Sequence, residues 1–301
     1  MTKGVNMYTL PKNEYRISIT SACNMKCIYC HNEGNTNISS LSKDDIDLLL
    51  KNSYDIGLKS VRITGGEPTL HKQLAEICDL IKNKYHLQVG LNTNAIEKDK
   101  IVYLAKKKLI DRIVVGIDYF DAIVSKNSPI GEKSTKILSN ILEIKKYCPD
   151  TAISCVYDGN LDNIDKMVNW ALTNHIRIKI LEIVGKEFAE ASTKVYIDMR
   201  DYISKKYNLD LQTSEKYYYQ LQGFINGERV VSFFHSIHRL HQCDLCKKMH
   251  IRITSDGKFN GCMFLNYKRT DFRIGNVRQN ILDYFEYHFN IKSKSIEKEI
   301  N

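Results

Sequence analysis

The chain has 301 residues, 43% of them hydrophobic, which is enough to bury one large core with a smaller appendage. It contains nine cysteines, yet its N-terminal stretch "MTKGVNMYTLPKNEYR" is polar and has no apolar signal segment. This argues against an exported disulfide framework, so we expect a soluble, cytoplasmic protein. No apolar run approaches the length of a membrane span, and we expect no membrane partner.

The net charge of +9 results from 44 Lys and Arg against 35 Asp and Glu. The basic residues are spread over helical faces such as "AKKKLIDR" and "EIKKYC" rather than gathered with aromatic residues in one patch. This distribution favours a lysine-rich solvated surface over nucleic-acid binding. It leaves open a preference for anionic small molecules.

Residues 14–184 alternate short β-branched runs with longer amphipathic runs, which is typical of strand–helix units around a parallel sheet. The six strand candidates are residues 15–20, 60–64, 87–93, 112–118, 151–158 and 176–184. After the first strand, residues 42–57 predict a helix with Ser42 as its N-cap and Gly57 as its stop. Six strands are too few to close an eight-stranded barrel. We therefore predict an α/β fold, a partial (β/α)6 barrel over residues 14–210.

The pattern changes after a further helix near residues 192–207. Two hairpins follow, one turning at Asn226-Gly227 and one at Asp256-Gly257, because these dipeptides tolerate positive φ. The run "QNILDYFEYHF" then predicts a closing helix. Residues 211–301 are therefore expected to form a small C-terminal β-hairpin domain.

The first cysteine group follows the first predicted strand. Cys23, Cys27 and Cys30 form a C-x3-C-x2-C array on a loop at the carboxyl end of the sheet, where α/β barrels place their chemistry. Three thiolates around a four-iron cube leave one iron open to a small chelating molecule. A zinc knuckle would need a fourth ligand, and His31 follows Cys30 too closely to provide it. The array predicts a [4Fe–4S] cluster.

With Tyr29 before its last cysteine, this array resembles the CxxxCxΦC loop of the radical S-adenosylmethionine (SAM) superfamily. The resemblance implies that the open iron binds SAM and that one electron cleaves SAM to methionine and a 5′-deoxyadenosyl radical. The stretch "TGGEP" after the second strand is similar to the superfamily's GGE motif and supplies Gly65, Gly66, Glu67 and Pro68. Its glycines allow close backbone approach. The resemblance implies that Glu67 accepts a charge-assisted hydrogen bond from the SAM ammonium group.

Other cofactor-binding candidates lie at the ends of later strands. The resemblance implies that Thr93 and Asn94, which end the third strand, contact the ribose of SAM. Asp118 ends the fourth strand in a segment similar to the family's V-S-x-D, although Gly116 stands where a serine is common. A structural role for Asp118 therefore stays equally open. Val184 ends the sixth strand and is the last candidate.

A second cysteine group lies in the C-terminal part of the chain. Cys243, Cys246 and Cys262 resemble the ligands of the "twitch" appendage of the same superfamily, which holds an auxiliary [4Fe–4S] cluster. The resemblance implies two [4Fe–4S] clusters per chain. Zinc stays open at this second site, because His241 and His250 are close in sequence. Buried structural thiols are the interpretation of the remaining cysteines, Cys78, Cys148 and Cys155.

Within the superfamily, the chain resembles the GTP 3′,8-cyclases of molybdenum-cofactor biosynthesis nearly end to end, through "RISIT", "CHNEG" and "CDLCKKMHIRITSDGKFNGC". The resemblance implies that Arg16 and Arg252 bind the substrate. His71 and His250 stand where the cyclases have arginines, and the chain ends in "SIEKEIN" without a terminal Gly-Gly. Histidine is mostly neutral at pH 7 and does not grip phosphate as arginine does. We therefore expect a weakened triphosphate site.

The sequence predicts a radical SAM enzyme, a paralogue of the cyclases, that abstracts hydrogen from a small nucleotide-, nucleoside- or sugar-like substrate. A peptide-modifying twitch enzyme, which crosslinks or epimerises a ribosomal peptide, and a divergent GTP 3′,8-cyclase stay open as alternatives. Other radical SAM chemistry and a non-enzymatic iron–sulfur or zinc protein are the remaining classes. The radical chemistry implies an electron donor such as flavodoxin or ferredoxin as a partner. The sequence predicts no particular oligomeric state.

Overall fold

The structure is a computed structural model that describes residues 13–27, 29–32, 38–53, 56–120, 134–183, 191–214, 217–235, 251–260 and 270–289. The chain divides into two compact units. Unit 1 comprises Met1–Ala22, His31–Val89 and Cys243–Asn301, and unit 2 comprises Cys23–Cys30 and Gly90–Gln242.

Unit 1 is built on strand β1 (Glu14–Ser18), which pairs in parallel with β2 (Ser60–Thr64) on one side and with β10 (Ile251–Ile253) on the other. Strand β11 (Phe259–Asn260) adds to β10 in antiparallel orientation, so the hairpin predicted at Asp256-Gly257 is confirmed. Alternate residues of β1, Tyr15 and Ile17, are fully buried. They face helix α1 (Lys43–Lys51), because the Tyr15 hydroxyl forms a 2.8 Å hydrogen bond with Ser53 Oγ just after this helix.

Helix α1 begins as the sequence predicts. Ser42 caps it in a capping box, in which Ser42 Oγ accepts from the Asp45 backbone N–H and the Asp45 carboxylate accepts from the Ser42 N–H. The prediction that Gly57 ends this helix is wrong. The helix ends at Lys51, where Asn52 Nδ2 donates to the Leu48 carbonyl oxygen and offers the chain an alternative to a further turn.

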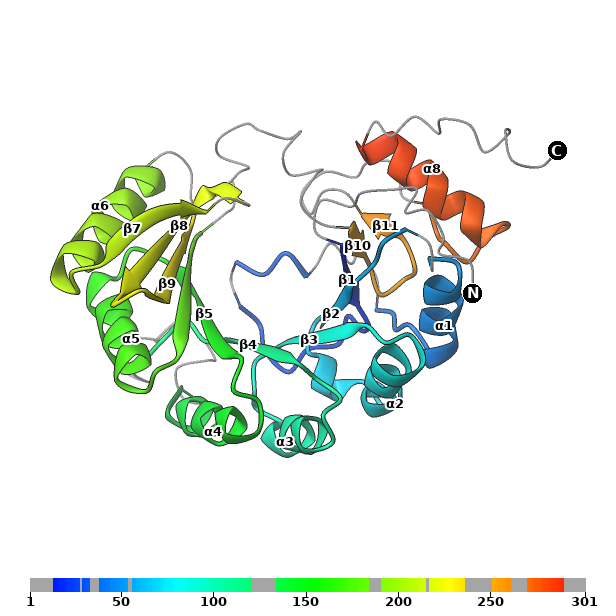
Figure 1. Cartoon of the computed structure of the whole chain (residues 1–301), viewed down its shortest axis with the longest axis horizontal. Helices are drawn as coiled ribbons and strands as arrows, with labels where there is room; N and C mark the ends of the chain where they lie inside the picture. Colours follow the sequence, from blue (N-terminus) through cyan, green and yellow to red (C-terminus); the bar gives the residue numbers. More distant parts are fainter. Residues whose placement is uncertain are drawn as a thin grey trace. The chain divides into compact units, whose positions relative to one another are not determined.

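Unit 1 also contains α2 (Leu74–Asp79), which continues into the π-helix η3 (Leu80–Lys84), and α8 (Val277–Phe289), the predicted closing helix. Figure 1 shows α1 and α2 on the same side of β1 and β2. The opposite face of these strands is therefore available to polar side chains.

Unit 2 contains the end of strand β3 (Gln88–Thr93) and the parallel strands β4 (Arg112–Gly116), β5 (Thr151–Tyr157) and β6 (Arg177–Glu182). Helices α3 (Lys98–Lys106), α4 (Ser134–Tyr147) and α5 (Leu161–Thr173) connect them and lie along one face (Figure 1). All six strands expected from the sequence are present as β1–β6, and the predicted α/β fold with a parallel sheet is confirmed.

Helix α6 (Ala191–Lys206) leads into three antiparallel strands of unit 2, β7 (Asp210–Ser214), β8 (Tyr217–Ile225) and β9 (Glu228–Phe234). The hairpin predicted at Asn226-Gly227 is confirmed, with φ values of 50° and 80° at its two turn residues. Strand β9 pairs in parallel with β6. The elements expected in residues 211–301 therefore lie partly in unit 2 and partly in unit 1, and the domain boundary at residue 210 stays a prediction.

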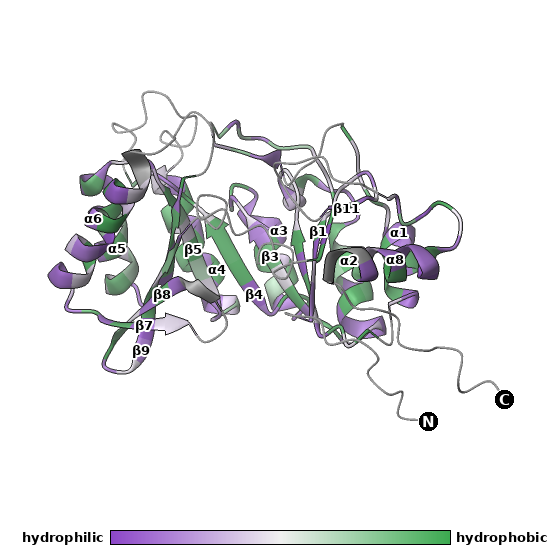
Figure 2. Ribbon diagram, turned by 90° about the horizontal axis from the view of Figure 1, so that it is seen from above, coloured by the Kyte–Doolittle hydropathy of each residue, from purple (hydrophilic) through white to green (hydrophobic). Residues whose placement is uncertain are grey.

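Hydrophobic residues predominate along β4 and β5, whereas α5 and α6 mix hydrophobic and hydrophilic residues (Figure 2), as expected for strands covered by amphipathic helices. Within the described part of the chain, no helix combines the length and the apolar character that crossing a membrane requires.

Candidate active site

The first cysteine group lies on the short segment of unit 2 that follows β1 in the chain. Cys23 and Cys30 are exposed and Cys27 is half-buried. Two backbone contacts shape this loop, because the Cys30 N–H donates to the Cys27 carbonyl oxygen at 3.1 Å and the Met25 N–H donates to Cys23 Sγ at 3.4 Å. The three thiols are thus held on one tight loop, with two of them open to an incoming group.

The donor set fits an iron–sulfur cluster. Burial, followed by the charge of Asp118, raises the pKa of Cys27 to about 12, and Cys30 and Cys23 lie close enough to add to the rise. Because cysteine binds metal as the thiolate, such a thiol needs a nearby positive charge, which iron supplies.

Tyr29 connects this loop to the carboxyl end of β4. Its hydroxyl donates a short hydrogen bond to Asp118 Oδ2, and Asp118 Oδ1 accepts from the Val156 N–H at 2.9 Å. Burial raises the pKa of Asp118 to about 6 and, together with the charge of Asp118, raises the pKa of Tyr29 well above its usual range. The Asp118 carbonyl oxygen also accepts from Asn163 Nδ2 at 2.6 Å. Asp118 therefore holds the loop in place, whatever further role it has.

A second contact joins the loop to the end of β3. Asn94 Nδ2 donates to Asn24 Oδ1 at 2.7 Å, and Asn24 directly follows Cys23. Asn94 Oδ1 and Thr93 Oγ1 each accept a 3.1 Å bond from a backbone N–H two residues later, which fixes the turn after the strand. The structure thus brings Thr93, Asn94 and Asp118 to the same edge of the unit 2 sheet, as the sequence predicts for parallel strands. The involvement of Asn24 was not predicted, because no motif marks it.

The GGE turn of unit 1 packs against backbone. The Gly66 N–H donates to the Thr20 carbonyl oxygen at 2.7 Å and the Glu67 N–H to that of Ala22 at 2.8 Å. A Cβ atom at Gly66 would lie 2.3 Å from the Ala22 oxygen, and one at Gly65 would lie 2.4 Å from the Thr20 oxygen. Both positions therefore require glycine. They fix the backbone that leads directly into Cys23.

Glu67 is almost completely buried, with 1% of its surface exposed. Its Oε1 accepts from the Thr69 N–H at 3.0 Å and from Thr69 Oγ1 at 2.6 Å, so it caps the short 3-10 helix η2 (Pro68–Leu70). Pro68 fits the first position of this helix, where a missing N–H costs nothing. The role of Glu67 toward the SAM ammonium group stays a prediction.

Arg16 and Arg252, the two predicted substrate arginines, are neighbours in unit 1. Arg252 on β10 pairs in register with Arg16 on β1, and Arg16 pairs on its other side with Arg62 on β2. Neighbouring strands lie about 4.8 Å apart, so the three arginines form a row across the sheet. The row lies on the face opposite α1, since alternate residues of β1 face that helix.

Arg62 was missed in the sequence, although a signal was present. The dipeptide Arg-Ile occurs at the same level of β1, β2 and β10, and strand alternation then puts each arginine on the same face. Arg62 Nη2 donates to Glu14 Oε2 at 3.0 Å, in an ion pair whose side chains are 18% and 14% exposed. Among the described residues, the buried Glu14 Oε1 has no hydrogen-bond partner.

Both ring nitrogens of His71 form hydrogen bonds with backbone groups. Its Nε2 lies 2.9 Å from the Leu41 carbonyl oxygen and its Nδ1 accepts from the Gln73 N–H at 3.1 Å, so the ring carries its proton on Nε2. Burial lowers the pKa of His71. The ring is therefore neutral and anchors its own loop.

The remaining sequence candidates lie outside the described residues. These are Val184, His250, Cys243, Cys246 and Cys262. Their assignments stay predictions.

The chain matches a known family over its first half and is similar to known proteins over most of its length. The family model of the radical SAM superfamily matches residues 17–171. Probable GTP 3′,8-cyclases of Thermococcus kodakarensis and Sulfolobus acidocaldarius are 26% and 28% identical, over 92% and 88% of this chain and 94% and 86% of theirs.

Two solved structures have a similar fold. The crystal structure of Streptococcus suis SuiB bound to S-adenosylmethionine has a TM-score of 0.66 and 17% identity, over 93% of this chain and 68% of that one. Native anSMEcpe with bound AdoMet has a TM-score of 0.62 and 17% identity, over 91% of this chain and 80% of that one. Because the family model spans more than half of the chain, this protein belongs to the radical SAM superfamily and is an enzyme of SAM-cleaving radical chemistry, with SAM and a [4Fe–4S] cluster as its cofactors.

Proposed function

We propose that this enzyme acts on a small anionic substrate of the nucleotide, nucleoside or sugar class, and that Arg16 and Arg252 bind it. The observation that carries the proposal is the row of Arg62, Arg16 and Arg252 at one level of three adjacent strands. A row of guanidinium groups is suited to phosphate, because each can donate two parallel hydrogen bonds to its oxygens.

The charge and burial of the row support an anionic ligand. Glu14 offsets the charge of Arg62. Arg252 is only 9% exposed, and a guanidinium group at such a position is screened by water far less than a surface charge. A phosphate or carboxylate group is the chemical complement of this row.

We infer that the enzyme is a paralogue of the GTP 3′,8-cyclases rather than a cyclase itself. Identities of 26% and 28% support a related architecture. At His71, however, where those enzymes have arginine, a neutral ring uses both of its nitrogens on backbone groups. The site then lacks one phosphate-binding cation, and we expect GTP to be a poor substrate. Efficient GTP turnover would make the chain a divergent cyclase.

The proposal includes the SAM contacts expected from the motifs. Glu67 would accept from the SAM ammonium group, and Thr93 and Asn94 would contact the ribose. The cysteine loop, the GGE turn and the ends of the later strands supply the other candidates, Tyr29, Gly65, Gly66, Pro68, Asp118 and Val184. The positions of Asn94 and Tyr29 against the cysteine loop support this assignment.

We also propose a twitch domain in residues 211–301, with a second [4Fe–4S] cluster on Cys243, Cys246 and Cys262. His250 would lie beside it as a substrate residue. Flavodoxin or ferredoxin would supply the electron, in the cytoplasm. The support for this part is the spacing of the cysteines alone.

A peptide substrate is the second candidate. Solved structures of SuiB bound to precursor peptide SuiA and of anSMEcpe with a peptide share the fold of this chain, at 17% and 18% identity. Similarity at this level supports the fold alone, whereas the arginine row favours a phosphate-bearing ligand. We therefore rank the small-molecule substrate first.

The proposal is tested by anaerobic turnover. The reconstituted enzyme is incubated with SAM, dithionite and one candidate at a time: nucleoside mono- and triphosphates, nucleosides, nucleotide sugars and short peptides. We expect a nucleotide or nucleotide sugar other than GTP to stimulate 5′-deoxyadenosine formation and to appear as a new product by mass spectrometry. Stimulation by peptides alone would overturn the proposal.

A further inference from the structure

A second cluster of arginines lies in unit 2, at the edge of the sheet opposite the cysteine-loop contacts. Arg112 and Arg177 are the first residues of β4 and β6, and Asp150 directly precedes β5. Asn94 and Asp118 follow the other ends of β3 and β4. Because these strands are parallel, the two groups lie at opposite edges of this sheet.

One carboxylate pairs with two of the three arginines at this edge. Asp150 Oδ2 accepts from Arg112 Nε at 2.6 Å, and Asp150 Oδ1 accepts a short bond from Arg177 Nη2. Arg229 makes no ion pair among the described residues. Burial, followed by the positive charges of Arg177 and Arg112, lowers the pKa of Arg229. The cluster therefore carries more positive than negative charge.

A β-bulge directs Arg229 to this place. Strands β8 and β9 pair Gly223 with Val231 but Phe224 with Arg229, so Val230 is an extra residue. Without the bulge, Arg229 would share the face of Val231 and Phe233, which are buried. The bulge instead puts Arg229 on the same face as Gln222 and Phe224.

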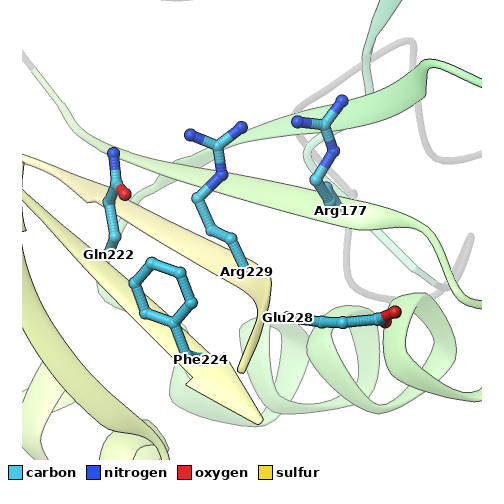
Figure 3. Close-up of a pocket in the computed structure, with 5 residues that line it drawn as sticks. All are labelled: Arg177, Gln222, Phe224, Glu228 and Arg229. Atoms are coloured by element: carbon cyan, nitrogen blue, oxygen red, sulfur yellow. The ribbon is translucent and has the colours of Figure 1, made fainter. Parts of the chain in front are cut away.

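These side chains line one pocket of about 480 Å³, formed by Arg177, Gln222, Phe224, Glu228 and Arg229. Figure 3 shows the guanidinium groups of Arg177 and Arg229 side by side and pointing in the same direction, with Phe224 and Gln222 next to Arg229. The Glu228 carboxylate points away from them (Figure 3). This pocket is an open depression rather than an enclosed cavity, so a ligand in it would stay partly exposed to solvent.

We propose that this pocket is a second binding site, separate from the active site, for a nucleoside monophosphate. The paired guanidinium groups of Arg177 and Arg229 match a phosphate group. The Phe224 ring offers a face on which a base can stack, and the Gln222 amide can both donate to and accept from a base edge. A ligand here would occupy the opposite edge of the sheet from the cysteine loop, as an effector rather than as the reacting substrate.

Isothermal titration calorimetry on the reconstituted full chain, saturated with SAM, tests this site. The probes are AMP, GMP, ribose 5-phosphate and adenosine. We expect AMP or GMP to bind saturably, and Arg229→Gln to weaken that binding by about tenfold to a hundredfold, since one charge-assisted contact is lost. Phe224→Leu is expected to weaken the nucleotides but not ribose 5-phosphate.

Two variants separate this site from other causes. Arg112→Gln removes the same charge from the same cluster without lining the pocket, so it is expected to change the affinity by less than about threefold. Arg252→Gln changes the candidate substrate row and is expected to leave this binding intact. Thermal unfolding midpoints of Arg229→Gln and Arg112→Gln should match, which shows that both variants fold.

The proposal is overturned if neither nucleotide binds saturably, or if Arg252→Gln removes the binding while Arg229→Gln preserves it. Equal loss with Arg112→Gln and Arg229→Gln would show a general charge effect and would also overturn it. If ribose 5-phosphate binds as tightly as AMP and GMP, the proposal that a base stacks on the Phe224 ring is overturned. Loss of binding in Arg252→Gln with Arg229→Gln preserved would instead assign the nucleotide to the arginine row, so failure of the second site is distinguishable from failure of the proposed substrate.

Discussion

The Tyr29 hydroxyl donates to the Asp118 carboxylate and so ties the loop between Cys27 and Cys30 to the end of β4. Both partners are largely buried, and the second carboxylate oxygen of Asp118 is held by the backbone of β5. A loop that must bind a cluster is thereby held by the rigid sheet at its aromatic residue. This explains in physical terms why an aromatic residue with a hydroxyl suits this position.

Tyr29→Phe is expected to lower the free energy of unfolding by about 1–3 kcal/mol, because a buried carboxylate oxygen loses its donor. Chemical denaturation of the reconstituted protein measures this loss, and the rate of iron loss to a chelator should rise in parallel. Tyr119→Phe is the matched control, since the Tyr119 hydroxyl donates to Asp158 at an exposed site. Equal effects of the two changes would contradict the role given to Tyr29.

Gly66→Ala is expected to destabilise the protein by about 1–3 kcal/mol or more, since overpacking against fixed backbone forces a shift. The new Cβ would meet the Ala22 oxygen at 2.3 Å. At Gly116, by contrast, the nearest atom to an added Cβ is 4.0 Å away, so Gly116→Ala should leave stability unchanged or raise it by about 0.4–1 kcal/mol. Thermal unfolding of the two variants, with SAM affinity as a second measurement, distinguishes them. A tolerated alanine at Gly66 would refute the packing described for the GGE turn.

His71 predicts a loss of stability in acid. Its pKa is lowered in the fold, so the unfolded chain binds the proton more readily, and stability falls as the pH drops below the unfolded value of about 6.5. The neutral ring accepts from the Gln73 N–H, a bond that protonation would break. Urea unfolding between pH 5 and 8 should show a steeper acid loss for the wild type than for His71→Gln. Parallel curves would show that His71 does not carry this dependence.

The strand–helix repeat was predictable because the local spacing of hydrophobic residues indicates each strand and helix. Tyr15 and Ile17 alternate with polar residues in β1, and Ser42 with Asp45 marks the start of α1. Strand β7 was missed, because its sequence "DLQTS" is polar and its side chains are mostly exposed. Tertiary pairing rather than local preference makes it a strand.

The site was only partly predictable, because register is not local. The motifs located the cysteine loop and the GGE turn, but the row of Arg62, Arg16 and Arg252 depends on which residues pair across three strands. The bulge at Val230, which turns Arg229 toward Phe224, has no glycine on its own strand, and the only sequence mark is Gly223 on the partner strand at the register shift. The histidine at position 71 suggested a weakened anion contact, whereas its bonds to Leu41 and Gln73 give it a loop-anchoring function.

The proposed second cluster predicts about eight irons per chain after anaerobic reconstitution. Replacing Cys23, Cys27 and Cys30 together by alanine should remove about half of the iron and abolish SAM cleavage. Replacing the three cysteines of the second group by alanine should remove the other half of the iron. Cys78→Ala is the control, because this buried thiol of α2 should bind no iron. About four irons with one zinc per chain in the wild type would contradict the second cluster.

The central claim, that the arginine row binds the phosphate of the substrate, is tested most directly by comparing a substrate nucleotide with its nucleoside. Steady-state 5′-deoxyadenosine formation gives kcat and KM for both compounds on the wild type, on Arg252→Gln and on Arg200→Gln, whose arginine pairs with Asp201 on α6. We expect Arg252→Gln to raise the nucleotide KM by about tenfold to a hundredfold and to leave the nucleoside unchanged, with no effect of Arg200→Gln. A wild type that does not distinguish the two compounds, or an unchanged preference in Arg252→Gln, would contradict the claim.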